Sequence, residues 1–358
     1  MPASCGCSGW GPPVPELPEV ETVARDLRGL ILGATIVGAR VSWPRTVRTH
    51  APELFGEAVA GHRVVDVGRR AKLIVVHLSG DAVLTIHLKM TGQLFVVPAG
   101  APEDPYVRLV LELDNGREIH FRDIRKFGRV GLYQADGTPF AAFGPEPLDP
   151  AFTLRAFRKL IRRRKARLKP LLVDQAFLAG VGNIYADEAL WAARLHPLRS
   201  AASLHPPDER RLYLELRRVL AEAVARRGSS IDDYTAPEGD GTMQERLQIY
   251  QRTGEPCPRC GRPIRRVVIG ARSTHFCSWC QHLPSRDRAG AAAILRGIVP
   301  RDGVAPGRRG TRWTELAGKA AIGLSADEAA RAVERERAGR TRRAAATRRA
   351  RARAAVGG

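Results

Sequence analysis

The sequence predicts an α+β fold: an N-terminal helix and an antiparallel β-sandwich, followed by a helical domain and a small cysteine-rich hairpin. Three observations predict it. Short runs rich in Val, Ile, Leu and Thr recur between residues 34 and 133, the composition changes to helical after the prolines of 145–147, and two C-x-x-C pairs lie between 257 and 280. At 358 residues and 44% hydrophobic content, the chain is large enough for two or three domains with real cores.

The N-terminal helix is expected to open at Pro18. Val20, Val23, Ala24 and Leu27 then share one face, and acidic residues occupy the first turn. The stretch before it, residues 1–14, is rich in Gly, Pro, Ser and Cys and has no periodicity. We therefore interpret 1–14 as an extension outside the fold.

The next hundred residues read as eight short strands, separated by Gly, Asp and Pro turns such as Asp114-Asn115-Gly116. Strands at such close spacing are typical of two packed antiparallel sheets. The expected strands are 34–41, 62–67, 72–78, 82–88, 93–97, 106–113, 117–121 and 129–133.

A proline-stiffened linker, 143–148, precedes a basic helical pattern over 152–164. Two further helices are expected, one from Lys169 and one from Asn183, with the tight break Gly180-Val181-Gly182 between them. Free N–H groups at a helix N-terminus behind glycines can bind phosphate. This helix-two-turn-helix is therefore a candidate phosphate site.

The cysteine spacing is the most specific signal in the chain. Cys257 and Cys260 are separated from Cys277 and Cys280 by sixteen residues, which gives C-x2-C-x16-C-x2-C. Two thiolate pairs of this kind suit one tetrahedral, closed, structural Zn²⁺. Between the pairs, 264–269 and 273–276 are expected to form a hairpin with its tip at 270–272. Cys5 and Cys7 have no nearby partner ligands.

The net charge of +21 favours a polyanionic partner, of which nucleic acid is the commonest, although a basic tail alone could produce it. No apolar run approaches the roughly 20 residues of a membrane span, and no signal peptide opens the chain. A cytoplasmic protein without membrane contact is expected.

From Pro15 to about Gln281 the chain resembles the formamidopyrimidine-DNA glycosylases, base-excision repair enzymes that are also AP lyases. The resemblance rests on PELPEVE at 15–21, HLKMTG at 87–92, DIRKFG at 123–128, the helix-two-turn-helix and the zinc hairpin. It implies a β-sandwich packed on the first helix, and excision of oxidised purines such as 8-oxoguanine and formamidopyrimidines from damaged double-stranded DNA. It also implies strand nicking by β,δ-elimination, and a monomer in the bacterial cytoplasm, associated with the nucleoid.

The resemblance assigns catalysis to Pro15, Glu16, Lys72 and Arg272. A free N-terminal proline is a secondary amine with a pKa near ~8 rather than ~10.4, so roughly 200-fold more of it than of a lysine is unprotonated at neutral pH. It can attack a sugar C1′ and form an iminium ion, while Glu16 moves protons. Lys72 would contact phosphate and assist elimination, and Arg272 at the hairpin tip would grip phosphate and help the second elimination.

The remaining site residues would bind DNA. Met90 would fill the gap left by an extruded nucleotide, Arg125 would face the orphaned base and Phe127 would wedge into the duplex, because extrusion costs several kcal/mol of stacking and pairing. As isolated residues, Met90 and Phe127 would more often be core. Lys169 would reach the lesion side, Asn183 would cap its helix and hold a phosphate, and Glu188 would orient a loop. The full DNA-binding set is His87, Met90, Arg125, Lys126, Phe127, Arg164, Lys169 and Asn183.

Two departures from the family are visible. Its proline directly follows the initiator methionine, whereas here residues 1–14 would block the Pro15 nitrogen as an amide. We hypothesise that translation starts at a Val14 codon read as methionine, which is then trimmed; Pro2 could be exposed similarly, but no glutamate follows it. The second departure is a histidine before the sixth strand, replaced here by Asp104 or Pro105.

The expected domains are an untranslated extension (1–14), the catalytic sandwich (15–140), the helix-two-turn-helix domain (150–235), the zinc finger (245–282) and a basic, largely disordered tail (283–358). The tail is expected to tether DNA and to hold a helix over 324–337, and the loop over 228–244 is expected to cover the lesion. Two alternatives stay open. An endonuclease VIII-like enzyme would prefer oxidised pyrimidines, although PELPEVE favours purines, and a non-catalytic zinc-ribbon protein would only bind DNA.

Overall fold

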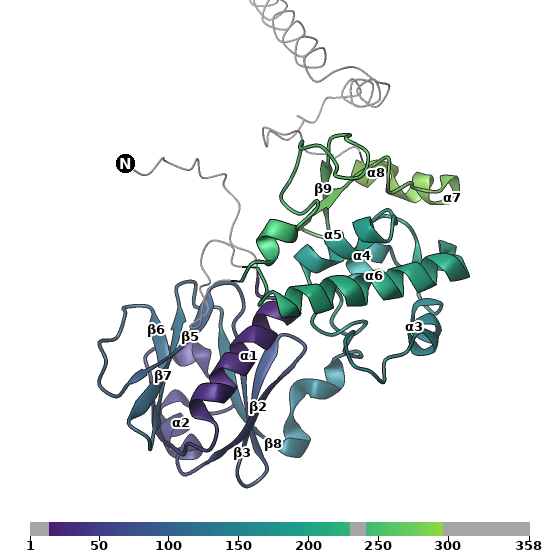
Figure 1. Cartoon of the computed structure of the whole chain (residues 1–358). Helices are drawn as coiled ribbons and strands as arrows, with labels where there is room; N and C mark the ends of the chain where they lie inside the picture. Colours follow the sequence, from purple (N-terminus) through teal and green to yellow (C-terminus); the bar gives the residue numbers. More distant parts are fainter. Residues whose placement is uncertain (1–13, 230–240, 296–358) are drawn as a thin grey trace, which may run out of the picture. The chain divides into compact units, whose positions relative to one another are not determined.

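The computed structural model describes residues 14–229 and 241–295 (Figure 1). The extension over 1–13, most of the expected lesion-covering loop, and the basic tail after residue 295, with its expected helix at 324–337, lie outside the described residues. The first part of the expected disordered tail, 283–295, instead forms short helices, because Leu283 and Ala291 are buried against the hairpin. Among the described helices, none combines the length and the apolar character that crossing a bilayer requires.

The N-terminal half is a sandwich of two four-stranded antiparallel sheets, as the short, closely spaced apolar runs predicted. One sheet has the order β1-β6-β7-β5 and the other β2-β3-β4-β8. Their inner faces meet in one core that includes Ile74, Leu84 and Phe121. The strands are β1 (Ile36–Val41), β2 (Val64–Arg70), β3 (Leu73–Leu78), β4 (Ala82–His87), β5 (Gly92–Pro98), β6 (Val107–Leu113), β7 (Arg117–Asp123) and β8 (Arg129–Gln134).

Helix α1 (Leu17–Ile31) packs along the sandwich against β2 and β3, and it also contacts α6 of the helical domain (Figure 1). Val20, Val23, Ala24 and Leu27 are buried, which confirms the predicted face. A second helix, α2 (Pro52–Val59), was not predicted from the sequence. It buries Phe55 and Val59, one turn apart, and two apolar positions in so short a helix do not give a clear periodic signal in the sequence.

The helical domain has its own core, built around large buried side chains such as Phe157, Phe177 and Tyr185. Its helices are α3 (Leu154–Ile161), α4 (Leu168–Leu172), α5 (Asn183–Ala192) and α6 (Pro206–Ala225). Between α4 and α5, Gly180 has φ +81°, a left-handed conformation that favours glycine. A Cβ there would lie 2.8 Å from Cβ of Leu17, so the connection is pressed against the start of α1.

The hairpin of β9 (Arg265–Ile269) and β10 (Arg272–Phe276) follows, as predicted. Phe276 on β10 packs with Leu198 and Leu283, so the hairpin shares apolar contacts with the segment after α5. The described chain ends in the short helices α7 (Ser285–Arg288) and α8 (Ala292–Leu295). Short 3-10 turns occur at Pro44–Thr46, Ala135–Gly137, Pro139–Ala142, Ala201–Ser203, Met243–Arg246 and Ala289–Ala291.

Candidate active site

The Glu16 side chain, from the residue before α1, lies on the N-terminus of α5. Its Oε1 accepts the Ile184 N–H at 2.8 Å, and its Oε2 accepts the Tyr185 N–H at 3.3 Å. Unpaired N–H groups and the helix dipole favour a carboxylate at this position. Pro15 beside it is buried, and Val14 before it is 36% exposed. The helix-two-turn-helix therefore holds the residue next to the proposed nucleophile.

Lys72 converges on the same point from the turn between β2 and β3. A Cβ on Gly182 would lie 2.4 Å from Glu16 Oε1 and 2.5 Å from Lys72 Nζ, so a side chain at position 182 would collide with both groups. Burial raises the pKa of Glu16, an effect that the positive charge of Lys72 opposes. Burial likewise lowers the pKa of Lys72, against the attraction of Glu16 and Glu19. Burial thus shifts the two pKa values toward each other, and the attraction between the two charged groups opposes both shifts.

Glu19, one turn further along α1, holds the backbone of Glu16 in place. Its Oε2 accepts the Glu16 backbone N–H at 3.0 Å, and its Oε1 accepts the Ser229 N–H at 2.8 Å and the Ser229 hydroxyl at 3.0 Å. The Tyr185 hydroxyl also donates to Glu19 Oε1. Burial, together with Glu19, raises the pKa of Tyr185 well above its usual value, so the phenol keeps its proton.

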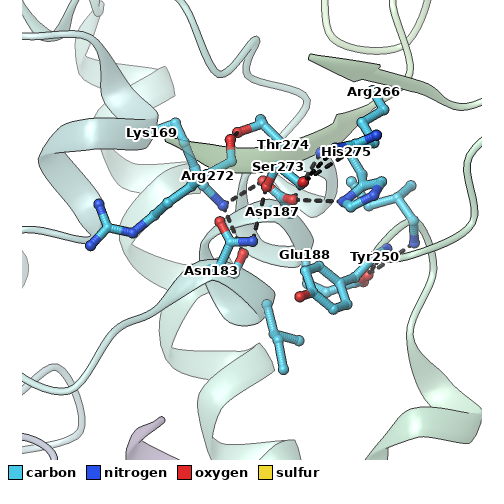
Figure 2. A network of polar contacts seen from close by, with 12 residues as sticks. Lys169, Asn183, Asp187, Glu188, Tyr250, Arg266, Arg272, Ser273, Thr274 and His275 are labelled. Atoms are coloured by element: carbon cyan, nitrogen blue, oxygen red, sulfur yellow. Dashed lines mark hydrogen bonds and ion pairs between the residues drawn. The ribbon is translucent and has the colours of Figure 1, made fainter. Parts of the chain in front are cut away.

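A second buried network joins the helices to the zinc hairpin (Figure 2). Lys169 is 1% exposed, and its Nζ donates to Asp187 Oδ1 at 2.6 Å and to the Asn183 carbonyl at 2.7 Å. The other oxygen of Asp187 accepts the His275 N–H on β10 at 2.8 Å. Burial lowers the pKa of Lys169, and Asp187 opposes this shift. Lys169, expected to reach the lesion side, thus donates to groups inside the protein.

The prediction that Asn183 caps its helix is wrong. Gly182 is the N-cap and Asn183 is the first helical residue, with no side-chain cap hydrogen bond at this end. The Asn183 amide instead donates to the Ser273 carbonyl of β10 at 2.9 Å. The physical reason is that Glu16, from a distant part of the chain, already occupies the free N–H groups of the helix.

Glu188 holds a loop, as the sequence analysis expected. Its carboxylate accepts the backbone N–H groups of Gln248, Ile249 and Tyr250 at 2.9–3.0 Å. Arg272, at the start of β10, is exposed, and its side chain points away from the buried network (Figure 2). Its positive charge adds to the burial that lowers the pKa of Lys72 and of Lys169. Arg164, just after α3, is also exposed.

The two expected DNA-contacting loops lie side by side. Asp123 Oδ1 accepts the Thr91 hydroxyl at 2.5 Å, and the Thr91 oxygen accepts the Arg125 N–H at 3.1 Å. Phe127 is 44% exposed, and the Arg125 guanidinium carbon lies 5.0 Å from the centre of its ring. Phe127 is therefore a surface residue and not part of the core.

The other side chains of these loops are arranged as follows. Lys126 has φ 59°, and its Nζ lies 4.1 Å from the centre of the Trp43 ring. Met90 is half-buried. His87 Nδ1 accepts the Lys89 N–H at 3.1 Å, and burial with nearby Lys89, Lys72 and Arg129 lowers the pKa of His87 to about 3. His87 is therefore a neutral hydrogen-bonding group at physiological pH.

The four cysteines of the hairpin converge. All four Sγ atoms lie within 4.8 Å of one another, with Cys257 and Cys280 at 3.9 Å and Cys260 and Cys277 at 3.5 Å. Thiolates around a tetrahedral Zn²⁺ with bonds of about 2.3 Å would lie ~3.8 Å apart, so the donor set fits. Trp191 Nε1 donates to Cys257 Sγ at 3.4 Å, as expected for a thiolate ligand.

Comparison with known proteins agrees with this geometry. Three family models match: the formamidopyrimidine-DNA glycosylase N-terminal domain over residues 14–130, its H2TH domain over 143–235, and the zinc finger found in FPG and IleRS over 254–283. The formamidopyrimidine-DNA glycosylase of Herpetosiphon aurantiacus is 47% identical over 272 residues, which cover 75% of this chain and 100% of the relative. The chain belongs to the formamidopyrimidine-DNA glycosylase family.

Solved structures of formamidopyrimidine-DNA glycosylases share its fold. The MutM (Fpg) protein of Thermus thermophilus is 42% identical with a TM-score of 0.69, over 75% of this chain and 100% of that protein. The Lactococcus lactis Fpg in complex with DNA that contains an abasic site is 35% identical with a TM-score of 0.70, over 75% and 99%. Family membership confirms the predicted fold class, and the zinc-finger match together with the cysteine cluster confirms the structural zinc site.

Sequence reasoning missed several residues that shape this glycosylase site. Gly182 was treated only as a break between helices, and Asp187 and Tyr185 only as part of a helix. A signal existed for Glu19, because Glu16 and Glu19 have the i, i+3 spacing of an N-terminal capping pair. No local signal pairs Asp187 with Lys169, since they are brought together only by the packing of α4 on α5.

Proposed function

We propose that this protein is a base-excision repair DNA glycosylase with AP lyase activity that acts on oxidised purines, including 8-oxoguanine and formamidopyrimidines. The observation that carries the proposal is the convergence of Glu16, Lys72 and the N-terminus of α5 beside Pro15. The names of the relatives and the solved complex of Lactococcus lactis Fpg with DNA that contains Fapy-dG support the substrate class.

In the proposed reaction the Pro15 nitrogen attacks C1′ and loses its proton, the glycosidic bond breaks, and the base leaves with a proton supplied through Glu16. The C1′–O4′ bond of the sugar ring then breaks, O4′ takes a proton through Glu16, and C1′ is left as an iminium. The resulting iminium draws electrons when C2′ loses a proton, so the C3′–O bond breaks, and the C5′–O bond breaks in a second elimination. In this proposal Lys72, whose amine approaches Gly182 together with Glu16, moves protons in these steps, and Arg272 holds phosphate. This chemistry needs Pro15 at a free N-terminus, so we propose that residues 1–14 are absent from the active protein.

The DNA-binding roles are part of the same proposal. Phe127 and Arg125 are exposed on one loop, as a wedge and a contact to the orphaned base require. Zinc, when bound by the four cysteines, would offset part of their negative charge and fix the hairpin that carries Arg272. We further propose a monomer that acts on chromosomal DNA, domain boundaries close to 15–140, 150–235 and 245–282, and a basic tail over 283–358 that tethers DNA.

Borohydride trapping on defined duplexes tests the proposal. A covalent adduct with 8-oxoguanine that is lost when thymine glycol replaces the purine supports it. Stronger trapping with thymine glycol would favour the endonuclease VIII-like alternative, and no adduct with either lesion would favour a binding protein. For the tail, deleting 296–358 should flatten the dependence of DNA affinity on salt, because each lost phosphate contact removes released counterions. An unchanged salt slope would reject the tethering role.

A further inference from the structure

The linker between the two domains is bound tightly on one side to the helix-two-turn-helix. Gly144 N–H donates to the Gln175 carbonyl at 2.8 Å, and Ala179 N–H donates to the Pro145 carbonyl at 3.0 Å. A Cβ on Gly144 would lie 2.6 Å from the Phe177 carbonyl oxygen, so only glycine allows this approach. The linker is therefore a fixed strap rather than a free hinge.

On its other side the strap holds the turn between β2 and β3 through one carboxylate. Glu146 Oε1 accepts the Ala71 N–H at 2.7 Å and the Arg70 guanidinium at 2.8 Å. Glu146 Oε2 pairs with Arg69 at 2.8 Å. These hydrogen bonds and ion pairs lower the pKa of Glu146 although burial opposes the shift, so the group is a carboxylate at neutral pH.

Ala71 needs this support. It has φ 54°, a left-handed conformation that is unfavourable for a residue with a Cβ, and it is 1% exposed. Both of its backbone polar groups are held, the N–H by Glu146 and the carbonyl by Arg69 Nη1 at 2.8 Å. The next residue is Lys72. The direction in which Lys72 leaves the turn therefore depends on contacts that hold Ala71 in a strained conformation.

We propose that Glu146 is a positioning residue for Lys72. From the interdomain strap, Glu146 holds the turn before Lys72 and so directs the lysine amine to the site beside Glu16. The connection between α4 and α5, which binds the strap, also binds the start of α1, because the Gly180 carbonyl accepts the Leu17 N–H at 3.0 Å. The strap and this connection therefore link Lys72 to Glu16, the residue before Leu17, and fix the position of one relative to the other. This inference rests on the proposed function, since it concerns the elimination that follows Schiff-base formation.

The test uses natively processed, full-length protein and a duplex with a preformed abasic site under single-turnover conditions. Glu146→Ala should leave borohydride trapping near the wild-type level but slow strand nicking about 10- to 100-fold, the usual effect of misplacing a reacting group by about 1 Å. Glu146→Gln keeps an acceptor for the Ala71 N–H and should be slowed less. Glu103→Ala, which removes an exposed ion pair with Arg40, is the matched control and should nick at the wild-type rate.

Two further variants separate positioning from general damage. In a Lys72→Ala background, Glu146→Ala should cause no additional loss, because the group that it positions is gone. Adding Ala71→Gly to Glu146→Ala should recover part of the nicking rate, since glycine adopts positive φ without steric cost.

Equal slowing by Glu146→Ala with and without Lys72, or a parallel fall of trapping and nicking in both Glu146 variants, would overturn the proposal. Absence of trapping by the wild-type protein would instead refute the proposed function, so the two failures are distinguishable.

Discussion

Gly182→Ala is expected to disable the site without altering any reacting group. The backbone at position 182 has φ −131° and ψ −155°, an extended conformation that alanine adopts without strain. The added Cβ would lie 2.2 Å from Glu16 Cδ, whereas ordinary contacts begin near 3.4 Å. The carboxylate must therefore move by roughly 1 Å, which typically costs about 10²-fold in rate. Overpacking of this kind also destabilises a protein by about 1–3 kcal/mol.

The assay is single-turnover excision of 8-oxoguanine, together with chemical unfolding to measure the free energy of unfolding. Gly29→Ala is the matched control: Gly29 lies within α1 and no atom lies within 4 Å of its added Cβ. The control should be fully active and more stable by about 1 kcal/mol, because alanine favours helix. Wild-type activity in Gly182→Ala would show that the placement of Glu16 against α5 is not needed for catalysis.

Three other predictions follow from the site. Asp187→Asn should lower the free energy of unfolding by about 3–5 kcal/mol, because it removes the negative charge that pairs with the buried Lys169 ammonium, and adding Lys169→Met should recover part of the loss; no recovery would contradict the pairing. Metal analysis should find one zinc per chain, and its removal by a chelator should abolish nicking; full activity of metal-free protein would contradict a structural role. Because the pKa of His87 is about 3, His87→Asn should leave the shape of the pH–rate profile between about pH 5 and 8 unchanged, and the loss of a limb near pH 6.5 would contradict this.

The buried carboxyl and amine of the site also have opposite effects on stability as pH changes. A raised pKa of Glu16 means that the folded state binds more protons than the unfolded state above pH ~4.5, so this group lowers stability as pH rises through that region. The lowered pKa of Lys72 means that the folded state binds fewer protons below pH ~10.5, so this group contributes stability that increases as pH rises toward that value.

Much of the fold is predictable because it is encoded locally. All eight strands appear within a few residues of their expected positions, since short runs of Val, Ile, Leu and Thr between Gly, Asp and Pro turns specify them directly. Helix α6 was missed although Pro206 at its start and Asp208 in its first turn are helix-opening signals. Lys72 was placed at the start of a strand, but it lies in the turn before β3, next to Ala71, whose N–H is held by residue 146 through a contact that no local pattern reveals.

The site could be predicted from the sequence only where its residues belong to one short motif. The cysteine spacing alone indicated the zinc cluster, because the ligand chemistry fixes the geometry. The role of Gly182 and the charge pairing of Lys169 depend on segments far apart in the chain. The error at Asn183 has the same origin: the helix is capped by Glu16, which lies 168 residues from Ile184 in the sequence.

The most direct test of the account is to map the residue that carries the sugar after borohydride trapping. Natively produced protein is trapped on an 8-oxoguanine duplex, digested, and analysed by mass spectrometry. We predict a chain that begins at Pro15, with the deoxyribose remnant on the proline nitrogen. A fully active protein that still begins at Met1, or an adduct on a lysine such as Lys72, would contradict the central claim that the Pro15 nitrogen is the nucleophile.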